Sequence, residues 1–169
     1  MKTSKTKPAA KNSDAQLREH LIYLLKGGGA HAKFNQVVKD MPEKLRGVKP
    51  NGLPHSAWML LEHLRLAQED ILEFSINPKY KHREWPKDYW PESAAPPSAG
   101  AWDKSIQQFR KDLKATEDLV ANPKTDLFAP IPWGDGQTIL REALLVADHN
   151  AYHIGQLVDV RRLLGAWQS

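Results

Sequence analysis

The stretch that decides the fold is TILREALLVADHNAYHIGQLVDVRRLLG, residues 138–165. Its apolar residues recur at the three- and four-residue spacing of one helix face. They are Leu140, Leu144, Leu145, Val146, Leu157, Val160, Leu163 and Leu164. Thr138 is a suitable N-cap residue and Gly165 a suitable C-terminal stop. We therefore predict one long amphipathic helix that begins near Thr138 and ends at Gly165.

Two other segments have the same periodicity, at about residues 55–75 and 101–121. A further helix is expected from an N-cap at Asp14 to Asp40, although three consecutive glycines at 27–29 interrupt it. Glycine costs about 1 kcal/mol inside a helix relative to alanine, so we expect this helix to be long and kinked. No segment has a convincing strand pattern. The predicted fold class is all-α, and the predicted architecture is a four-helix bundle.

Residues 77–100 join the second and third predicted helices without any helical periodicity. The segment combines prolines with aromatic residues, namely Pro78, Pro86, Pro91, Pro96 and Pro97 with Tyr80, Trp85, Tyr89 and Trp90. A loop of this length is unusual in a compact domain. It is either the crossover that a bundle with parallel neighbouring helices needs, or a lid over a site. Both interpretations stay open at this point.

The net charge of +4 over 169 residues is concentrated at the start of the chain. Four lysines against Asp14 give the first fourteen residues a charge of +3, which leaves +1 for the remainder. We expect residues 1–13 to form a disordered basic tail and residues 14–169 to form one domain. A nearly neutral domain without a basic stripe argues against specific nucleic-acid binding.

Cysteine is absent from the chain, which excludes disulfides, thiolate ligands and a cysteine nucleophile. No run approaches the roughly 20 apolar residues of a membrane span. The N-terminal lysines are not followed by the apolar segment of a secretory signal. We therefore expect a cytoplasmic protein that does not contact membranes, in which any metal would be held by His, Asp, Glu or water.

His149 and His153 lie four residues apart, so a helix would present both imidazoles on one face. His63 occupies a similarly apolar setting in another predicted helix and could meet them inside a bundle. Three such imidazoles would hold a divalent metal and leave one position for water or substrate. The alternative is that they are core histidines satisfied by hydrogen bonds. The remaining histidines, His20, His31, His55 and His82, are expected to be structural or exposed, although close packing at the glycines could bring His31 to the site.

Neighbouring polar residues have less direct roles in this hypothesis. Asp148 and Asn150 point about 100° away from His149 around the helix, so they could fix a ligand tautomer from outside the site. Glu62 is expected to face solvent. The chain contains neither a GxSxG nor an HExxH motif, nor a carboxylate pair spaced for acid–base catalysis. If the protein performs chemistry, a metal ion is expected to carry it.

These motifs resemble the DinB-like superfamily of four-helix bundles, which includes the YfiT-like proteins. The resemblance covers nearly all of residues 14–167. Its most specific parts are Trp58-x-Leu60-Leu61-x-His63-Leu64 and His149-x3-His153-x2-Gln156-Leu157. It implies an up-down-down-up bundle with a long crossover between helices two and three. It also implies a divalent metal ion (zinc, nickel or iron) held by His63, His149 and His153, and homodimers are common in the family.

The resemblance implies less about activity than about the fold and the metal ligands. Some relatives are similar to thiol-dependent S-transferases that conjugate low-molecular-weight thiols to electrophiles, whereas others have no established activity. The leading hypothesis is a divalent-metal-dependent enzyme that transfers a thiol to small electrophiles. The alternatives are a metal-dependent hydrolase that uses a metal-bound water, and a non-catalytic metal-binding stress-response module.

Overall fold

The structure is a computed structural model that describes residues 12–29 and 31–167. Within these residues the chain forms helices and turns but no β-strand, with a single isolated bridge between Pro130 and Thr138. The helices are α1 (Ser13–Leu25), α2 (Phe34–Val38), η1 (Glu43–Leu45), α3 (Ala57–Ile76), η2 (Lys87–Tyr89), α4 (Ala101–Ala121) and α5 (Ile139–Leu163), where η1 and η2 are short 3-10 helices. The predicted all-α class is confirmed.

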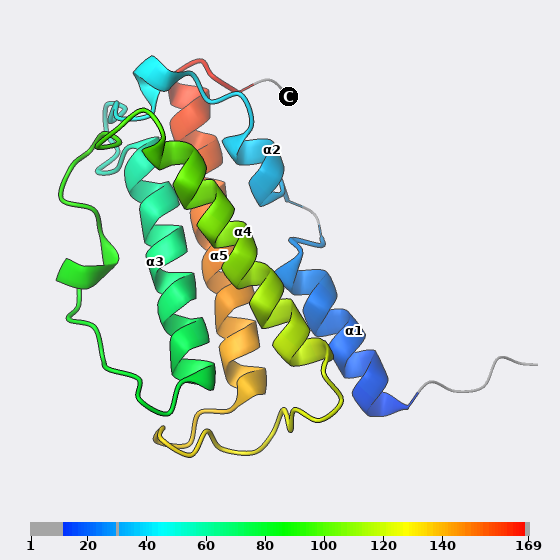
Figure 1. Ribbon diagram of the computed structural model, residues 1–169. Helices are drawn as coiled ribbons and strands as arrows, with labels where there is room; N and C mark the ends of the chain where they lie inside the picture. The colour runs from blue at the N-terminus through cyan, green and yellow to red at the C-terminus, as the bar shows by residue number, and fades with distance from the viewer. Residues whose placement is uncertain (1–11, 30, 168–169) are drawn as a thin grey trace, which may run out of the picture.

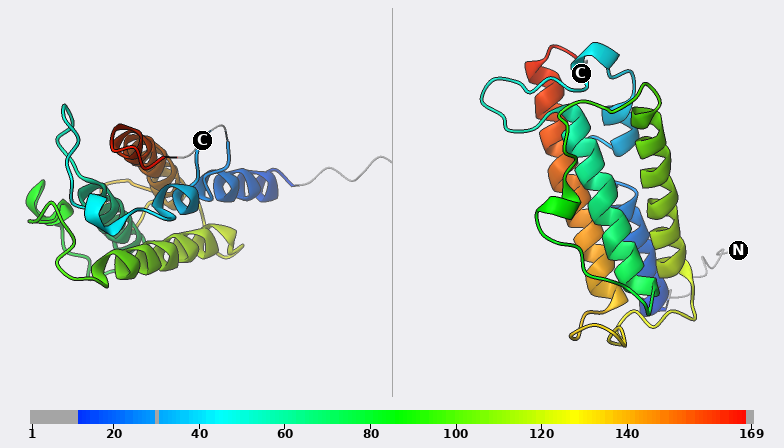
Figure 2. Two further views of the ribbon diagram at one scale, coloured as in Figure 1. Left: turned by 90° about the horizontal axis from the view of Figure 1, so that it is seen from above. Right: turned by 60° about the vertical axis from the view of Figure 1, so that its left-hand side comes forward.

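The four long helices pack side by side (Figure 1). Both α1 and α3 contact α4 and α5, so α1 and α3 lie across the assembly from each other. In Figure 1, α1 and α5 run upward and α3 and α4 run downward. Because α3 and α4 run in the same direction, the chain between them must return along their full length. Residues 77–100 make this return along the outer side of α3, as the right-hand view of Figure 2 shows.

The ends of α5 are set by the residues that the sequence indicates. The Thr138 hydroxyl accepts a hydrogen bond from the Arg141 backbone N–H at 3.2 Å. Gly165 has a φ of +66°, and the N–H groups of Gly165 and Ala166 donate to the carbonyls of Arg162 and Arg161. This pair of bonds is a Schellman motif, which satisfies the last helical carbonyls.

The prediction of one long helix from Asp14 to Asp40 is wrong. The helix α1 ends at Leu25, and α2 begins only at Phe34. Gly27 has a φ of +67°, and the Gly28 N–H donates to the Tyr23 carbonyl, which closes α1 with a second Schellman motif. A Cβ atom on Gly28 would lie 2.5 Å from that same carbonyl oxygen. The glycines therefore end the helix instead of kinking it.

The start of α1 also differs slightly from the prediction. The N-cap is Asn12, whose side chain accepts from the Asp14 N–H, and the helix begins at Ser13. Apart from Asn12 and Ser13, the predicted disordered tail lies outside the described residues.

Buried apolar side chains form two clusters, one at each end of the bundle. One contains Phe34, Leu61, Leu64, Trp102, Phe109, Ile154 and Leu157, and the other contains Leu21, Leu25, Phe74, Val120, Leu127 and Val146. Two buried amide side chains lie between them along the helices. Gln68 lies between the two clusters on α3, and Asn150 lies between them on α5.

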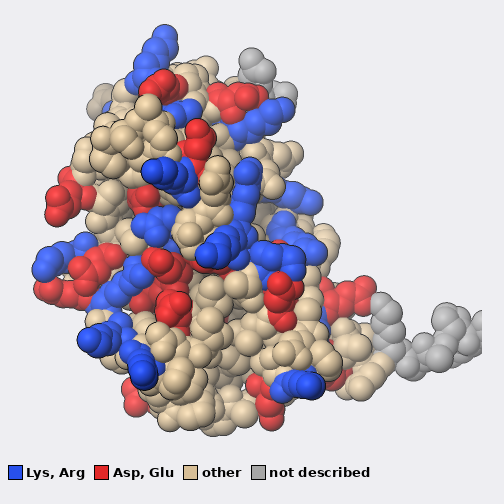
Figure 3. Space-filling view, viewed as in Figure 1, with Lys and Arg blue, Asp and Glu red and all other residues tan. Residues whose placement is uncertain are grey.

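The surface carries both signs of charge. On the face shown in Figure 3, basic and acidic side chains are interspersed, with uncharged areas between them. Among the described residues, no helix has the length and apolar character that crossing a bilayer requires.

Arg18 ties the end of α4 to α1. Its guanidinium donates to the carbonyl oxygens of Val120 at 2.7 Å, Asn122 at 3.0 Å and Thr125 at 2.8 Å. These carbonyls belong to the C-terminal end of α4 and the turn after it, where helix-internal donors run out. The planar guanidinium reaches all three at once, which a lysine ammonium could not do with the same geometry.

Replacing Arg18 with methionine is expected to lower the free energy of unfolding by about 2–4 kcal/mol, because buried carbonyls lose their donors. Urea denaturation at neutral pH measures this change. Arg162→Met is the matched control, since Arg162 is exposed and has one long ion pair to Asp159 at 3.4 Å. It should change stability by no more than about 0.5 kcal/mol. Equal losses in the two variants would contradict the role given to Arg18.

Candidate metal centre

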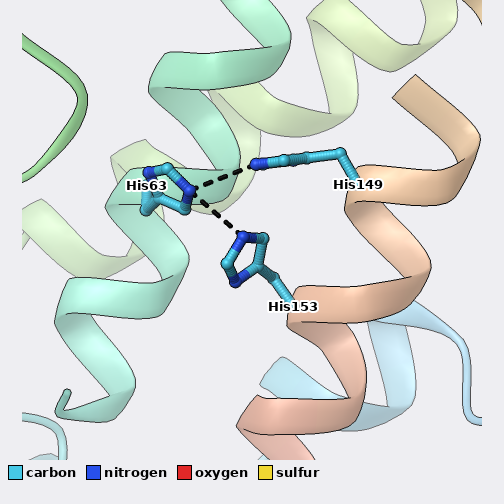
Figure 4. Close-up of side chains that lie close together, drawn as sticks. All are labelled: His63, His149 and His153. Carbon is cyan, nitrogen blue, oxygen red and sulfur yellow. Dashed lines mark hydrogen bonds between the residues drawn. The ribbon is translucent and has the colours of Figure 1, made fainter. Parts of the chain in front are cut away.

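Three histidines meet between α3 and α5 (Figure 4). The Nε2 atom of His63 lies 3.2 Å from Nε2 of His153 and 3.1 Å from Nε2 of His149. One nitrogen from each ring lies within 4.8 Å of the other two, which is a grouping that could hold a metal ion. The structure therefore brings together the three histidines that the sequence singles out.

Burial keeps these imidazoles neutral. His63 is 2% exposed and His153 is 8% exposed, and His149 is partly buried. Burial lowers the pKa of His149 to about 3, and the neighbouring His153 and His63 contribute to the same shift. Burial also lowers the pKa of His153 to about 4 and lowers the pKa of His63 below its ordinary value. Neutral imidazole is the form that binds a metal.

The outer nitrogens of two rings are fixed by hydrogen bonds. Nδ1 of His63 lies 2.8 Å from the Tyr89 carbonyl oxygen, and Nδ1 of His153 lies 2.7 Å from Oε1 of Gln156. A carbonyl oxygen only accepts, so Nδ1 carries the proton in both rings. In the neutral rings, the lone pairs of the two Nε2 atoms then face each other across 3.2 Å. Hydrogen bonds of this kind orient the histidines of metal sites.

The chemistry of this donor set fits a divalent ion. One proton on His149 could bridge to His63, but it would leave the lone pairs of His63 and His153 opposed. A cation bound by all three rings removes that repulsion. Tetrahedral zinc with nitrogens about 2.0–2.1 Å away separates its ligands by about 3.3 Å. The separations of His63 Nε2 from the other two Nε2 atoms are close to this value, and three such ligands would leave one position for water or substrate.

The segment between α3 and α4 forms one side of the centre. The Trp90 ring stacks on His63 with centroids 3.9 Å apart and an interplanar angle of 1°. Its other face stacks on His55 at 4.1 Å. Tyr89, the preceding residue, supplies the carbonyl that holds His63. This segment therefore connects two helices and also covers one side of the histidine group.

Asp70 fastens the same segment to α3. Its buried carboxylate accepts hydrogen bonds from the hydroxyls of Tyr80 at 2.9 Å and Tyr89 at 2.6 Å. The Arg83 guanidinium lies 3.4 Å from it. Burial, with these contacts to Asp70, raises the pKa of Tyr80 to about 12 and raises the pKa of Tyr89 as well. Both tyrosines thus stay protonated and keep donating, which holds the Tyr89 carbonyl in place against His63.

The other histidines lie outside the group. His20, His31 and His82 are exposed, and the nearest polar contact of the His31 ring is the Ala32 carbonyl oxygen. His55 stacks on Trp90 and does not belong to the histidine grouping. The expectation that Glu62 faces solvent is wrong, because its side chain is buried and paired with Arg65 at 2.7 Å.

Sequence reasoning allowed Asn150 a tautomer-fixing role, but it gave none to the residues that contact His63 and His153, namely Tyr89, Trp90 and Gln156. Gln156 carries a usable signal, since it follows His153 by three residues and so lies on the same helix face. Tyr89 and Trp90 carry no such signal. Tyr89 acts through its backbone carbonyl, and Trp90 reaches the site only because the loop folds back along α3.

Comparison with known proteins completes the description of the site. The family model described as the DinB superfamily matches residues 29–157, which include all three histidines. No curated protein and no solved structure has a significant match to this chain. The family match covers more than half of the sequence and agrees with the all-helical fold. The chain belongs to the DinB superfamily.

Proposed function

We propose that this protein binds one divalent metal ion through the Nε2 atoms of His63, His149 and His153, and that it is a metal-dependent enzyme. The observation that carries the proposal is the convergence of these nitrogens at 3.1 and 3.2 Å while two outer nitrogens are held by acceptors. Zinc, nickel and iron all accept imidazole ligands.

The ligand set favours activation of a weak acid. Three neutral imidazoles leave the full positive charge of the ion, because no carboxylate belongs to the grouping among the described residues. A divalent ion held in this way lowers the pKa of a water or thiol at its remaining position. The chain's own part is to keep the imidazoles neutral and their lone pairs directed inward.

The reaction that we propose is thiol S-transfer to a small electrophile. A low-molecular-weight thiol would lose its proton to solvent water, its sulfur would form a bond to the electrophilic carbon, and the leaving group would depart with the bonding electrons. Two exposed rings beside the histidines offer an apolar surface for the electrophile. Trp85 lies 6.4 Å from His63 and Tyr152 lies 4.9 Å from His153, measured between ring centroids. Family membership also supports this reaction class.

The alternative function is a hydrolase that uses a metal-bound water. A third hypothesis is a non-catalytic metal-binding module. The hydrolase would use the same three histidines, with a metal-bound water in place of the thiol. We further propose the family's up-down-down-up bundle, with residues 77–100 as its crossover, which the helix directions in Figure 1 support. We also propose that the protein forms a homodimer. We propose no specific nucleic-acid binding and no membrane binding.

Protein purified without a nickel column is expected to contain close to one divalent metal ion per chain. The double variant His149→Ala, His153→Ala should lose it, because one imidazole cannot hold the ion. Elemental analysis by plasma mass spectrometry measures both. His20→Gln is the matched control, because His20 is exposed on α1, and it should keep its metal. Wild-type protein that stays metal-free after incubation with zinc, nickel and iron would rule out the site.

The metal-loaded protein is expected to consume a thiol and an electrophile together. A screen that pairs low-molecular-weight thiols with alkyl halides and epoxides, followed by mass spectrometry of thioether products, detects this. Ester cleavage that needs the metal but no thiol would favour the hydrolase. Bound metal without turnover in either screen would favour the non-catalytic module and contradict the transferase.

The metal-free protein should lose stability as the pH falls from about 6.5 to 4. Unfolded histidines titrate near 6.5, whereas His149 and His153 in the folded chain titrate near 3 and 4. Between these values the unfolded chain binds more protons, so acid favours unfolding. Each histidine adds at most about 1.4 kcal/mol per pH unit. Above pH 6.5 their contribution is complete.

Urea denaturation in the presence of a chelator, at several pH values, tests this dependence. A His149→Leu, His153→Leu variant should have a shallower decline than wild type over the same pH range. His20→Gln should decline as steeply as wild type. Parallel curves for wild type and the double variant would contradict the burial argument.

A further inference from the structure

The outer nitrogen of the third histidine differs from the other two. Nδ1 of His149 is buried and has no hydrogen-bond partner among the described residues. The adjacent residue, Asn150, is 5% exposed, and its Oδ1 atom is also buried without a partner. A buried polar atom without a partner costs free energy, and here a potential donor and a potential acceptor belong to neighbouring side chains.

Gln68 fixes the orientation of the Asn150 side-chain amide. Nε2 of Gln68 donates to the Phe109 carbonyl oxygen at 2.8 Å, and Nδ2 of Asn150 donates to Oε1 of Gln68 at 2.9 Å. The Phe109 carbonyl can only accept, so Gln68 must present its oxygen to Asn150. Asn150 must then turn its own oxygen away from Gln68. The chain of bonds thus leaves one acceptor, Oδ1 of Asn150, beside His149.

We propose that Asn150 and Gln68 are positioning residues for the metal ligand His149, with Asn150 Oδ1 accepting the Nδ1–H of His149 when the metal is bound. This inference rests on the proposed metal site. It gives His149 the outer-shell acceptor that Tyr89 gives His63 and Gln156 gives His153. The relay runs from the Phe109 carbonyl on α4 through Gln68 on α3 to Asn150 and His149 on α5.

The position of one proton explains the two unpaired atoms. Without a metal, Nε2–H of His149 can donate to Nε2 of His63, 3.1 Å away, and Nδ1 of His149 then carries a lone pair. Metal binding requires a bare Nε2, so the proton of the neutral ring must be on Nδ1. Nδ1 of His149 then becomes a donor, and Oδ1 of Asn150 is available to accept from it. The Asn150 side chain lies close enough to the His149 ring to interact with it.

The location of the two amides is difficult to explain by packing alone. Gln68 is 1% exposed and lies with Asn150 between two apolar clusters, where aliphatic residues of similar size would avoid the cost of burying amides. Buried polar pairs can also fix the register of packed helices. The two explanations differ in one measurable respect, because only positioning of His149 requires a hydrogen bond from its Nδ1–H in the zinc-loaded protein.

The test measures zinc affinity of folded, metal-free protein by chelator competition. Asn150→Leu should weaken zinc binding by about 10- to 100-fold, the usual effect of losing an outer-shell partner. Gln68→Met should weaken it in the same direction by a smaller factor, although Gln68 does not contact His149. Thr116→Val is the matched control. Thr116 is equally buried on α4 and bonds only the Asp112 carbonyl of its own helix, so this variant should bind zinc like wild type.

A spectroscopic measurement separates positioning from stability. In zinc-loaded wild type, nitrogen-15 NMR of the histidine rings should show His149 as the Nδ1–H tautomer with a slowly exchanging proton. In zinc-loaded Gln68→Met, which leaves Asn150 in place, this proton should exchange faster. If Asn150→Leu does not fold, Gln68→Met decides the question by affinity and by exchange.

Two results would overturn the relay, and they are distinguishable. Wild-type affinity in both variants, with only a lowered melting temperature, would overturn the relay and leave the metal site intact. Failure of wild type to bind zinc would overturn the metal site and the relay with it.

Discussion

The approach of His63 on α3 to His149 and His153 on α5 is the contact on which the rest of the site depends. Imidazole nitrogens 3.1 and 3.2 Å apart demand that two helices from distant parts of the sequence keep one register and one separation. A shift of one residue along either helix would turn a ring away by about 100°. Much of the surrounding structure serves to hold this register.

Three sets of polar contacts hold this register. Arg161 on α5 donates to the carbonyls of Val37 and Lys39, which fixes α2 against α5. Asp70 fastens the crossover so that the Tyr89 carbonyl and the Trp90 ring stay on His63. Gln68 and Asn150 join α3, α4 and α5 at the level of the histidines. These ties use buried polar groups, which are costly when unpaired, so each also specifies the arrangement that pairs it.

The crossover illustrates how one segment can meet two requirements. Helices α3 and α4 run in the same direction, so a long connection between them is a consequence of topology. Its path along α3 also places the Trp90 ring on His63, where it covers one face of the imidazole. A connection that is needed for the fold thus also lines one side of the histidine group.

The sequence by itself determined the helix class, the bounds of α4, both ends of α5 and the three candidate ligands, because periodicity, capping residues and the His-x3-His spacing are local signals. The prediction of one helix from Asp14 to Asp40 failed because local signals conflict there. Apolar residues keep helical spacing on both sides of residues 27–29, but the positive φ of Gly27 ends the helix. Only the tertiary structure decided that His63 reaches the α5 pair, that His31 does not, and that the Tyr89 carbonyl holds His63. The physical reason is that these contacts join residues far apart in sequence, and side-chain spacing along one helix carries no record of its neighbour's register.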